Sequence, residues 1–137
     1  MIRQADPHSA DDFKIVRDLA HTFNDKHYGI HLNDDKLERW YAYMPQLGGV
    51  IYISDNGFIA GFPVADPVRD WTALVETSWY AEDRAGARLL RKFINYGRII
   101  GADEVRMTTL TDTPAHAVAL LQRWGFEEIE RSHRLTL

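Results

Sequence analysis

The 137-residue sequence contains no cysteine. This absence excludes a disulfide framework, a thiolate nucleophile and a thiolate-bound zinc ion, and it suits a reducing compartment. Long apolar runs are also missing, since none approaches the roughly 20 residues that span a bilayer. Residues 1–14 lack the basic-then-apolar layout of a secretory signal. We therefore expect a soluble cytoplasmic protein with no membrane partner.

An excess of charge of one sign is lacking too. The formal net charge is −4 and the charged residues are dispersed along the chain. The basic surface typical of nucleic-acid-binding proteins is therefore absent, and we expect no nucleic-acid partner. With 45% hydrophobic residues and no repeat, low-complexity tract or linker, the sequence predicts a single domain over residues 1–137 with a core of its own.

Two helices are predicted in the first third of the chain, after a short strand at residues 1–5. Ser9 has the side chain of a helix N-cap, and apolar residues at helical spacing follow it as far as Phe23. Asn33 is a second N-cap candidate, and the helix that follows it should end before Pro45. Both helices therefore precede the main run of strands.

The middle of the chain is rich in strand-forming residues. Residues 50–54 and 58–65 are β-rich runs joined by Asp55, Asn56 and Gly57, and Asn-Gly between apolar runs is a strong hairpin signal. Residues 71–81 form a third run, in which larger and smaller side chains alternate. The sequence therefore predicts three successive strands.

A strand–helix–strand crossover follows. Apolar residues at helical spacing begin at Gly86 and end near Gly101, and residues 104–110 form another strand candidate. Such a crossover implies that the strands on either side of the helix are parallel. Thr113 then caps a last helix that has Pro114 in its first position. Residues 126–137 are expected to close the chain as a strand.

The turn before Gly86 is a candidate anion site. A strand that leads into the first turn of a helix presents unpaired N–H groups and the positive end of a dipole, which together suit a phosphate. Gly86 would allow close approach, and Arg84 and Arg88 would add charge at the rim. The alternative is an ordinary helix start with no ligand, because every α/β protein has helix N-termini.

Two segments resemble the GNAT superfamily of acyl-CoA-dependent N-acyltransferases. The residues "AEDRAG" at 81–86 resemble the Arg/Gln-x-x-Gly-x-Gly/Ala motif of that family, although only Gly86 matches strictly. Ala81 stands where the family has Arg or Gln, and Arg84 replaces the first glycine. The residues "AVALLQRWGFEEIE" at 117–130 resemble the family's Asn-x-x-Ala-x-x-Leu-Tyr-x-x-x-Gly-Phe segment. The order of elements is similar as well, which suits a divergent phage or bacterial member.

The resemblance implies a fold and a cosubstrate. The fold would be α/β of the α+β type, with a mixed, largely antiparallel sheet of about six strands, a splayed parallel central pair and about four flanking helices. Acetyl-CoA would bind where that pair splays. The backbone of three residues would contact the pantetheine, and five further amides would hold the pyrophosphate. The first group is Trp79, Tyr80 and Ala81, and the second is Arg84, Ala85, Gly86, Ala87 and Arg88.

The chemistry that the resemblance implies is acetyl transfer to a primary amine by direct attack on the thioester. Glu76 resembles the family's fourth-strand glutamate by placement and is the candidate base, while its alternative role is to pair with an arginine across the sheet or to face solvent. The family's usual acid is a tyrosine at the position of Leu121, which cannot donate a proton. Tyr80, His116 or a water molecule would have to take that role.

Two further readings remain open at this stage. Three histidines, His21, His27 and His31, lie near Asp25, but their spacing is not a known ligand pattern, so we expect surface histidines and no metal. The departures at Ala81 and Leu121 keep a second function in view, a catalytically weak or inactive binding module with the same fold. The sequence does not identify the amine acceptor, which would be a small molecule or a protein. It also leaves the oligomeric state open, with a homodimer among the states considered.

Overall fold

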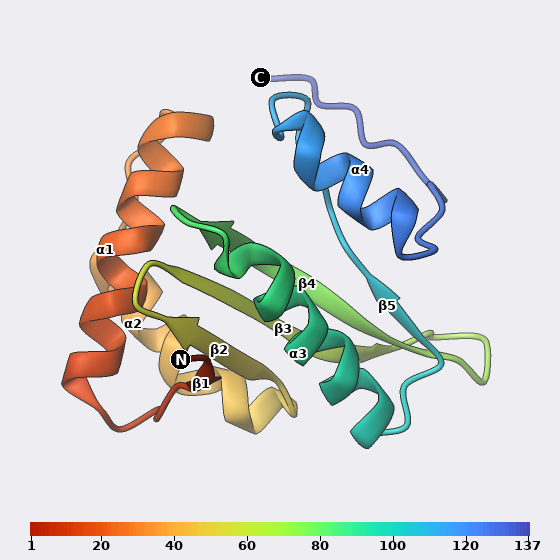
Figure 1. The fold of residues 1–137 in the computed structure, drawn as a ribbon, viewed down its shortest axis with the longest axis horizontal. Helices are drawn as coiled ribbons and strands as arrows, with labels where there is room; N and C mark the ends of the chain where they lie inside the picture. Colours follow the sequence, from red (N-terminus) through yellow and green to blue (C-terminus); the bar gives the residue numbers. More distant parts are fainter.

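The structure, a computed structural model, describes all of residues 1–137. It is a mixed sheet with helices on both faces (Figure 1). The elements, in chain order, are β1 (Arg3–Gln4), α1 (Ala10–His27), α2 (Asp34–Tyr43), the 3₁₀ helix η1 (Met44–Leu47), β2 (Val50–Ser54), β3 (Gly57–Ala65), β4 (Thr72–Ala81), α3 (Ala85–Ile99), β5 (Glu104–Arg106) and α4 (Ala115–Arg123).

The sheet has five strands in the order β1-β2-β3-β4-β5. The first four are antiparallel neighbours, and only β4 and β5 are parallel. The predicted hairpin is confirmed, because Ser54 pairs with Gly57 at the end of β2 and β3. The predicted crossover through α3 is also confirmed, and the sheet has one strand fewer than the six expected.

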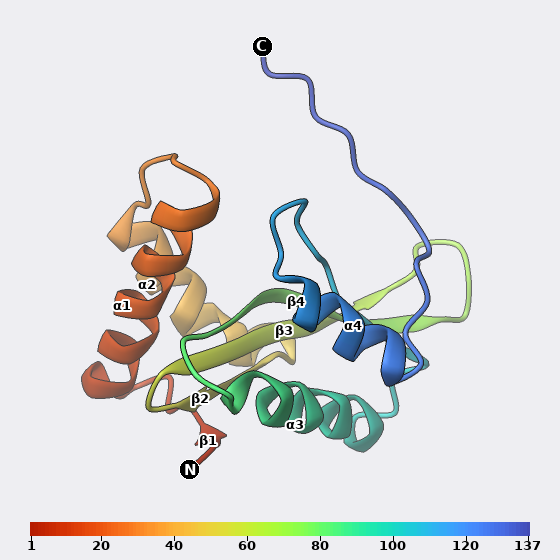
Figure 2. The same cartoon turned by 45° about the horizontal axis from the view of Figure 1, so that its top comes forward.

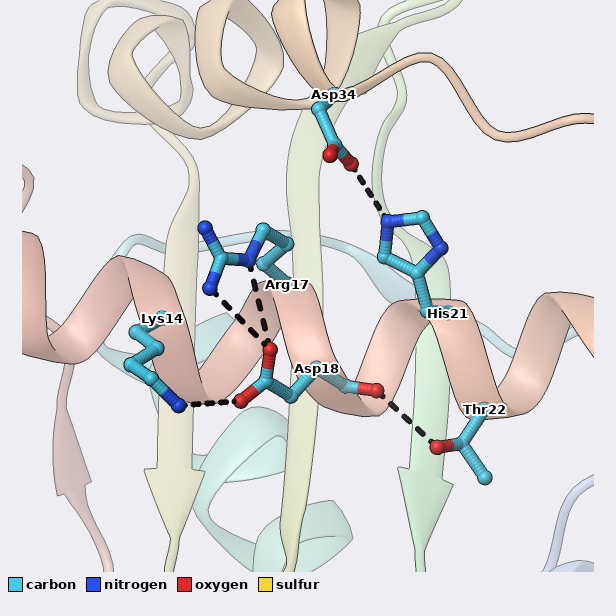
Figure 3. A network of polar contacts seen from close by, with 6 residues as sticks. All are labelled: Lys14, Arg17, Asp18, His21, Thr22 and Asp34. Carbon is cyan, nitrogen blue, oxygen red and sulfur yellow. Dashed lines mark hydrogen bonds and ion pairs between the residues drawn. The ribbon is translucent and has the colours of Figure 1, made fainter.

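The helices α1 and α2 pack on one face of the sheet. Val16 and Leu19 of α1 are buried against Ile51, Ile53 and Phe58 of the hairpin. Both predicted N-caps are confirmed, since the side chain of Ser9 accepts from the Asp12 amide and that of Asn33 accepts from the Lys36 amide. The two helices are also joined at the surface, where His21 contacts Asp34 at 2.6 Å (Figure 3).

The helix α3 covers the other face. Leu89, Leu90 and Phe93 on its apolar side are fully buried against Ile59 and Leu74 of the strands. The helix lies close to the sheet because β3 has a glycine beneath it. A Cβ at Gly61 would lie 2.5 Å from the Phe93 ring, so only glycine allows this approach. No helix is both long and apolar enough to cross a membrane.

The C-terminal third departs from the sequence-based expectations. The parallel strand β5 covers only Glu104–Arg106 of the predicted 104–110, and α4 begins at Ala115 with Pro114 as its N-cap. The predicted Thr113 cap is wrong, because its hydroxyl accepts from the Leu110 amide instead. The predicted final strand is also wrong. Residues 127–137 make no backbone hydrogen bond, and the chain there leaves the body of the molecule (Figure 2).

Candidate active site

The parallel pair β4–β5 opens after three residues. Ala73, Leu74 and Val75 pair with Glu104, Val105 and Arg106, and the pairing ends there. Beyond this point β4 continues to Ala81 while bonded only to β3, so one of its edges is unpaired. The predicted splay of the parallel pair is therefore present. Its unpaired edge offers backbone groups to an extended ligand arm.

Glu76 is the first residue of β4 beyond the pairing. Its partner on β3 is Gly61, and the next pair joins Ala60 to Ser78, so Thr77 is an extra residue that makes a bulge. Glu76 shares a face with Leu74, which packs under α3. The predicted base therefore lies on the α3 side of the sheet, directly where the two strands separate.

The Glu76 side chain is buried, with 8% of the residue exposed. Burial disfavours the ionised carboxylate and raises its pKa to about 7, while the backbone amide of Thr108 opposes this shift. No arginine or lysine forms an ion pair with it. The alternative role of Glu76 as a partner of an arginine is therefore absent from the structure. A carboxyl group that titrates near neutral pH in an opening of the sheet is suited to proton transfer.

The start of α3 is fixed to the end of β4. The indole Nε1 of Trp79 donates a hydrogen bond to the Gly86 carbonyl at 3.0 Å. Ala85 is buried below the turn, so the first amides of the helix are held in place. A Cβ at Gly86 would make only ordinary contacts, the nearest at 3.7 Å. The fold itself therefore does not require glycine at position 86.

The charges at this turn are of both signs. Arg84 and Arg88 are exposed and form no ion pair, so both are free to contact an anion. Asp83 works in the opposite direction, because its carboxylate accepts a hydrogen bond from the Ala85 amide at 2.8 Å. A bound pyrophosphate would have to displace or tolerate this carboxylate. The Ala81 side chain packs in the cluster under α3 and supplies no polar group.

Tyr80 lies on the other face of β4. Its ring packs with the cluster under α1 and lies 5.5 Å from the Phe23 ring. The hydroxyl accepts a hydrogen bond from Lys26 at 3.0 Å, and this bond raises the pKa of Lys26. Tyr80 and Glu76 are therefore on opposite sides of the sheet. They can act on one reacting centre only if it lies in the plane of the opening between β4 and β5.

The other two positions considered for the acid differ in exposure. His116, in the first turn of α4, is exposed, and its side chain forms no hydrogen bond to the protein. Leu121 is 7% exposed and packs in the cluster under α3. An apolar side chain therefore fills the place where the family resemblance expects a tyrosine. The structure adds no new proton donor from α4.

A contact that the sequence did not predict crosses the end of the opening. The Nδ1 atom of His27, the last residue of α1, lies 2.7 Å from the Asp112 carboxylate between β5 and α4. This contact joins the end of α1 to the loop between β5 and α4, across the opening of the β4–β5 pair. The two residues are 85 positions apart, and no local pattern in the sequence links them. His21 and His27 thus have separate acidic partners, and no group of three metal-ligating side chains lies together.

Comparisons with known proteins give matches of fold and none of sequence. No family model and no curated protein matches the sequence. Solved structures do match: an acetyltransferase of Trypanosoma brucei has 14% identity and a TM-score of 0.72, covering 100% of this chain and 99% of that one. AAC(6')-Iy, solved with a CoA-containing bisubstrate analogue, has 19% identity and a TM-score of 0.71, covering 100% and 97%.

A third solved structure extends the set. An acetyltransferase from Clostridium acetobutylicum, solved with acetyl-CoA, has 15% identity and a TM-score of 0.72, and the match covers 99% of this chain and 95% of that one. At such identities the likeness concerns the fold. The GNAT-like fold expected from the sequence is confirmed.

Proposed function

We propose that the protein is an acetyl-CoA-dependent N-acetyltransferase that transfers acetyl to a primary amine of a small molecule or protein. The observation that carries this proposal is the opening of the β4–β5 pair at Glu76, with a buried carboxyl group at its start. The likeness to solved acetyltransferases, two of them with CoA-containing ligands, supports the same activity.

The cosubstrate would lie along the unpaired edge of β4. Backbone groups of Trp79, Tyr80 and Ala81 are available there, because β4 is bonded on one edge only. The pyrophosphate would meet the amides of Arg84 to Arg88 at the start of α3, with the two arginine side chains at the rim. The carboxylate of Asp83 weakens this site, so we expect moderate affinity.

In the reaction, the amine nitrogen attacks the thioester carbon, the carbon–sulfur bond breaks, and CoA leaves as a thiolate. The amine must first lose a proton, and Glu76 is the group that we assign to accept it, directly or through water. The thiolate takes up a proton from Tyr80, His116 or water. With the pKa of Glu76 near 7, turnover should rise with pH through neutrality as the carboxylate form becomes populated.

Calorimetric titration with acetyl-CoA and with CoA tests the site. Gly86→Asp should abolish binding by repelling the pyrophosphate, without harm to the fold, since a side chain has room there and an acidic residue suits a helix start. Asp83→Asn should strengthen binding about two- to fivefold. Glu76→Gln should bind normally and lose turnover. No binding by the folded protein would refute the proposal.

The second candidate function is a binding module that has kept the fold without the reaction. The buried leucine at position 121 favours it, because no proton donor replaces the expected tyrosine. Saturable binding of acetyl-CoA, together with no turnover on a panel of amines at any pH, would support this candidate. Hydrolysis of the thioester that depends on Glu76 would exclude it.

A further inference from the structure

Arginine residues repeat at helical spacing along the exposed side of α3. They follow one another, from the N-cap of the helix onward, at steps of four, three, four and three residues, with one asparagine among them: Arg84, Arg88, Arg91, Asn95 and Arg98. Residues at such steps are neighbours on one side of a helix. They therefore form a straight row, about 21 Å long, which we call the arginine row.

The arginine row faces solvent over its whole length. All five residues are exposed, whereas Leu89, Leu90 and Phe93 on the opposite side of the helix are buried in the cluster with the strands. In Figure 2 α3 lies along the lower edge of the molecule, and no other helix lies beyond it. The guanidinium of Arg91 lies 5.4 Å from the centre of the Trp124 ring, which holds this side chain beside α4. None of the four arginines forms an ion pair, so their charge is available to a partner.

The charge of the chain is unevenly divided around this row. Residues 1–83 contain fourteen acidic and seven basic residues, whereas residues 84–125 contain three acidic and seven basic residues. Neither α3 nor α4 contains an aspartate or a glutamate, and Lys92 and Arg123 add two exposed charges. The expectation of no nucleic-acid partner depended on the net charge of −4, and a net charge does not reveal such a division.

We propose that the arginine row is a docking surface for duplex DNA, whose phosphates it contacts without reading the base sequence. Arginine suits this partner because its planar guanidinium binds a phosphate through two parallel hydrogen bonds. The asparagine in the row adds a side chain that hydrogen-bonds to phosphate or sugar oxygens. Duplex DNA is stiff over lengths far greater than that of α3, so a straight and rigid row can lie along the backbone that borders one groove.

Other polyanions fit the arginine row less well. Single-stranded nucleic acid is bound by aromatic side chains that stack on its unpaired bases, and the row contains no aromatic residue. A helix that lies on a membrane inserts its apolar side, and the apolar side of α3 is buried against the sheet. An acidic protein segment needs only positive charge, which lysine supplies equally well, whereas four of the five residues in the row are arginine. These differences select duplex DNA as the occupant.

Fluorescence anisotropy with a labelled DNA duplex of about 20 base pairs, at about 50 mM salt, tests the proposal on the 137-residue protein. The wild type should bind with a dissociation constant of about 1–100 μM. Arg91→Glu with Arg98→Glu should raise this constant about tenfold or more. Lys92→Glu with Arg98→Glu leaves the contact of Arg91 with Trp124 in place and should weaken binding similarly. The control Lys36→Glu with Arg39→Glu makes the same change of net charge on exposed α2 and should bind like the wild type.

The dependence of binding on salt gives a second measurement. Each phosphate contact contributes about 0.9 to the slope of log K against log salt, so Arg91→Glu with Arg98→Glu should reduce the slope by about two while the α2 control leaves it unchanged.

Three results would overturn the proposal. The first is a wild type that does not bind the duplex saturably. The second is an equal loss of binding in the α2 control, because the total charge would then matter and not α3. The third is equally tight binding of anionic lipid vesicles, polyglutamate or a single strand of the same length. Arg91 and Arg98 lie outside the turn at the start of α3, so the acetyl-CoA titration is unaffected and the two proposals fail separately.

Discussion

The two ends of the sheet are built differently. From β1 to β4 every strand is bonded to its neighbours. Side chains are fully buried on both faces of the sheet, such as Phe58 of β3 beneath α1 and Phe93 of α3 on the opposite face. From β5 onward the pairing is three residues long and α4 has one buried residue. The proposed active site lies on the boundary between these regions.

This difference suggests that the two halves of the sheet have different roles. The paired and well-packed antiparallel half holds β4 and the start of α3, so the groups that would hold acetyl-CoA are placed by packing. The open half supplies unpaired backbone and exposed side chains, which are what ligands and partners recognise. The boundary residue Glu76 belongs to both halves, since it is a buried residue of β4 and the backbone amide of Thr108, which follows β5, contacts its carboxylate.

The largest expected effect compares a large-to-small change in each half. Phe93→Ala removes a fully buried ring from α3, so the free energy of unfolding should fall by about 3–5 kcal/mol. Leu137→Ala, in the exposed C-terminal segment of residues 127–137, should change it by less than about 0.5 kcal/mol. Urea denaturation at low protein concentration measures both. Equal losses would show that the C-terminal segment is part of the core.

The same contrast explains which features the sequence could predict. The Asn56–Gly57 hairpin and the helix caps Ser9 and Asn33 depend on neighbouring residues only, and all are confirmed. The prediction of a strand at residues 126–137 is wrong because a strand also needs the edge of a distant strand as its partner, which no local pattern reveals. The prediction of Thr113 as a helix cap is wrong because its hydroxyl accepts a hydrogen bond from the Leu110 amide instead.

The candidate site, too, could be predicted from the sequence only in part. The family resemblance identified Glu76 by its placement in the fourth strand, and the structure buries it. Alternation could not show that Tyr80 points to the opposite face, because the bulge at Thr77 shifts the register within β4. The contact between His27 and Asp112 joins two distant segments, so only the three-dimensional fold reveals it.

The second prediction concerns the boundary residue. The folded pKa of Glu76, about 7, lies above the value of about 4.3 in an unfolded chain. The folded state therefore holds a proton more tightly, and the free energy of unfolding should fall as pH rises from about 4 to 7. The loss approaches about 3 kcal/mol and levels off above pH 7.

Glu76→Gln removes this titration and isolates it. The stability of the variant minus that of the wild type should increase by about 3 kcal/mol between pH 4.5 and pH 8, as measured by urea denaturation at several pH values. Glu82→Gln, at an exposed position directly after the end of β4, serves as the control and should show no such trend. A difference that stays constant with pH would show that Glu76 is ionised throughout.

The smallest effect compares one ion pair from each half. In the N-terminal half, Arg3 donates two hydrogen bonds to Asp12, at 2.6 and 2.8 Å, and the Asp6 amide donates a third. The bond from Arg3 is the main cause that lowers the pKa of Asp12 to about 2. This stabilisation is present above about pH 4 and is lost as pH falls toward 2. Asp12→Asn should cost about 1–2 kcal/mol at pH 7.

Glu128→Gln is the matched change in the other half. Glu128 accepts from Arg131 within the exposed residues 127–137, so its loss should cost less than about 0.5 kcal/mol. Urea denaturation at pH 7 and pH 3 separates the cases, because the cost of Asp12→Asn should shrink at the lower pH as the wild-type carboxylate begins to protonate. If both variants lose equal stability at pH 7, burial does not distinguish the two pairs, and the contrast between the halves rests on apolar packing alone.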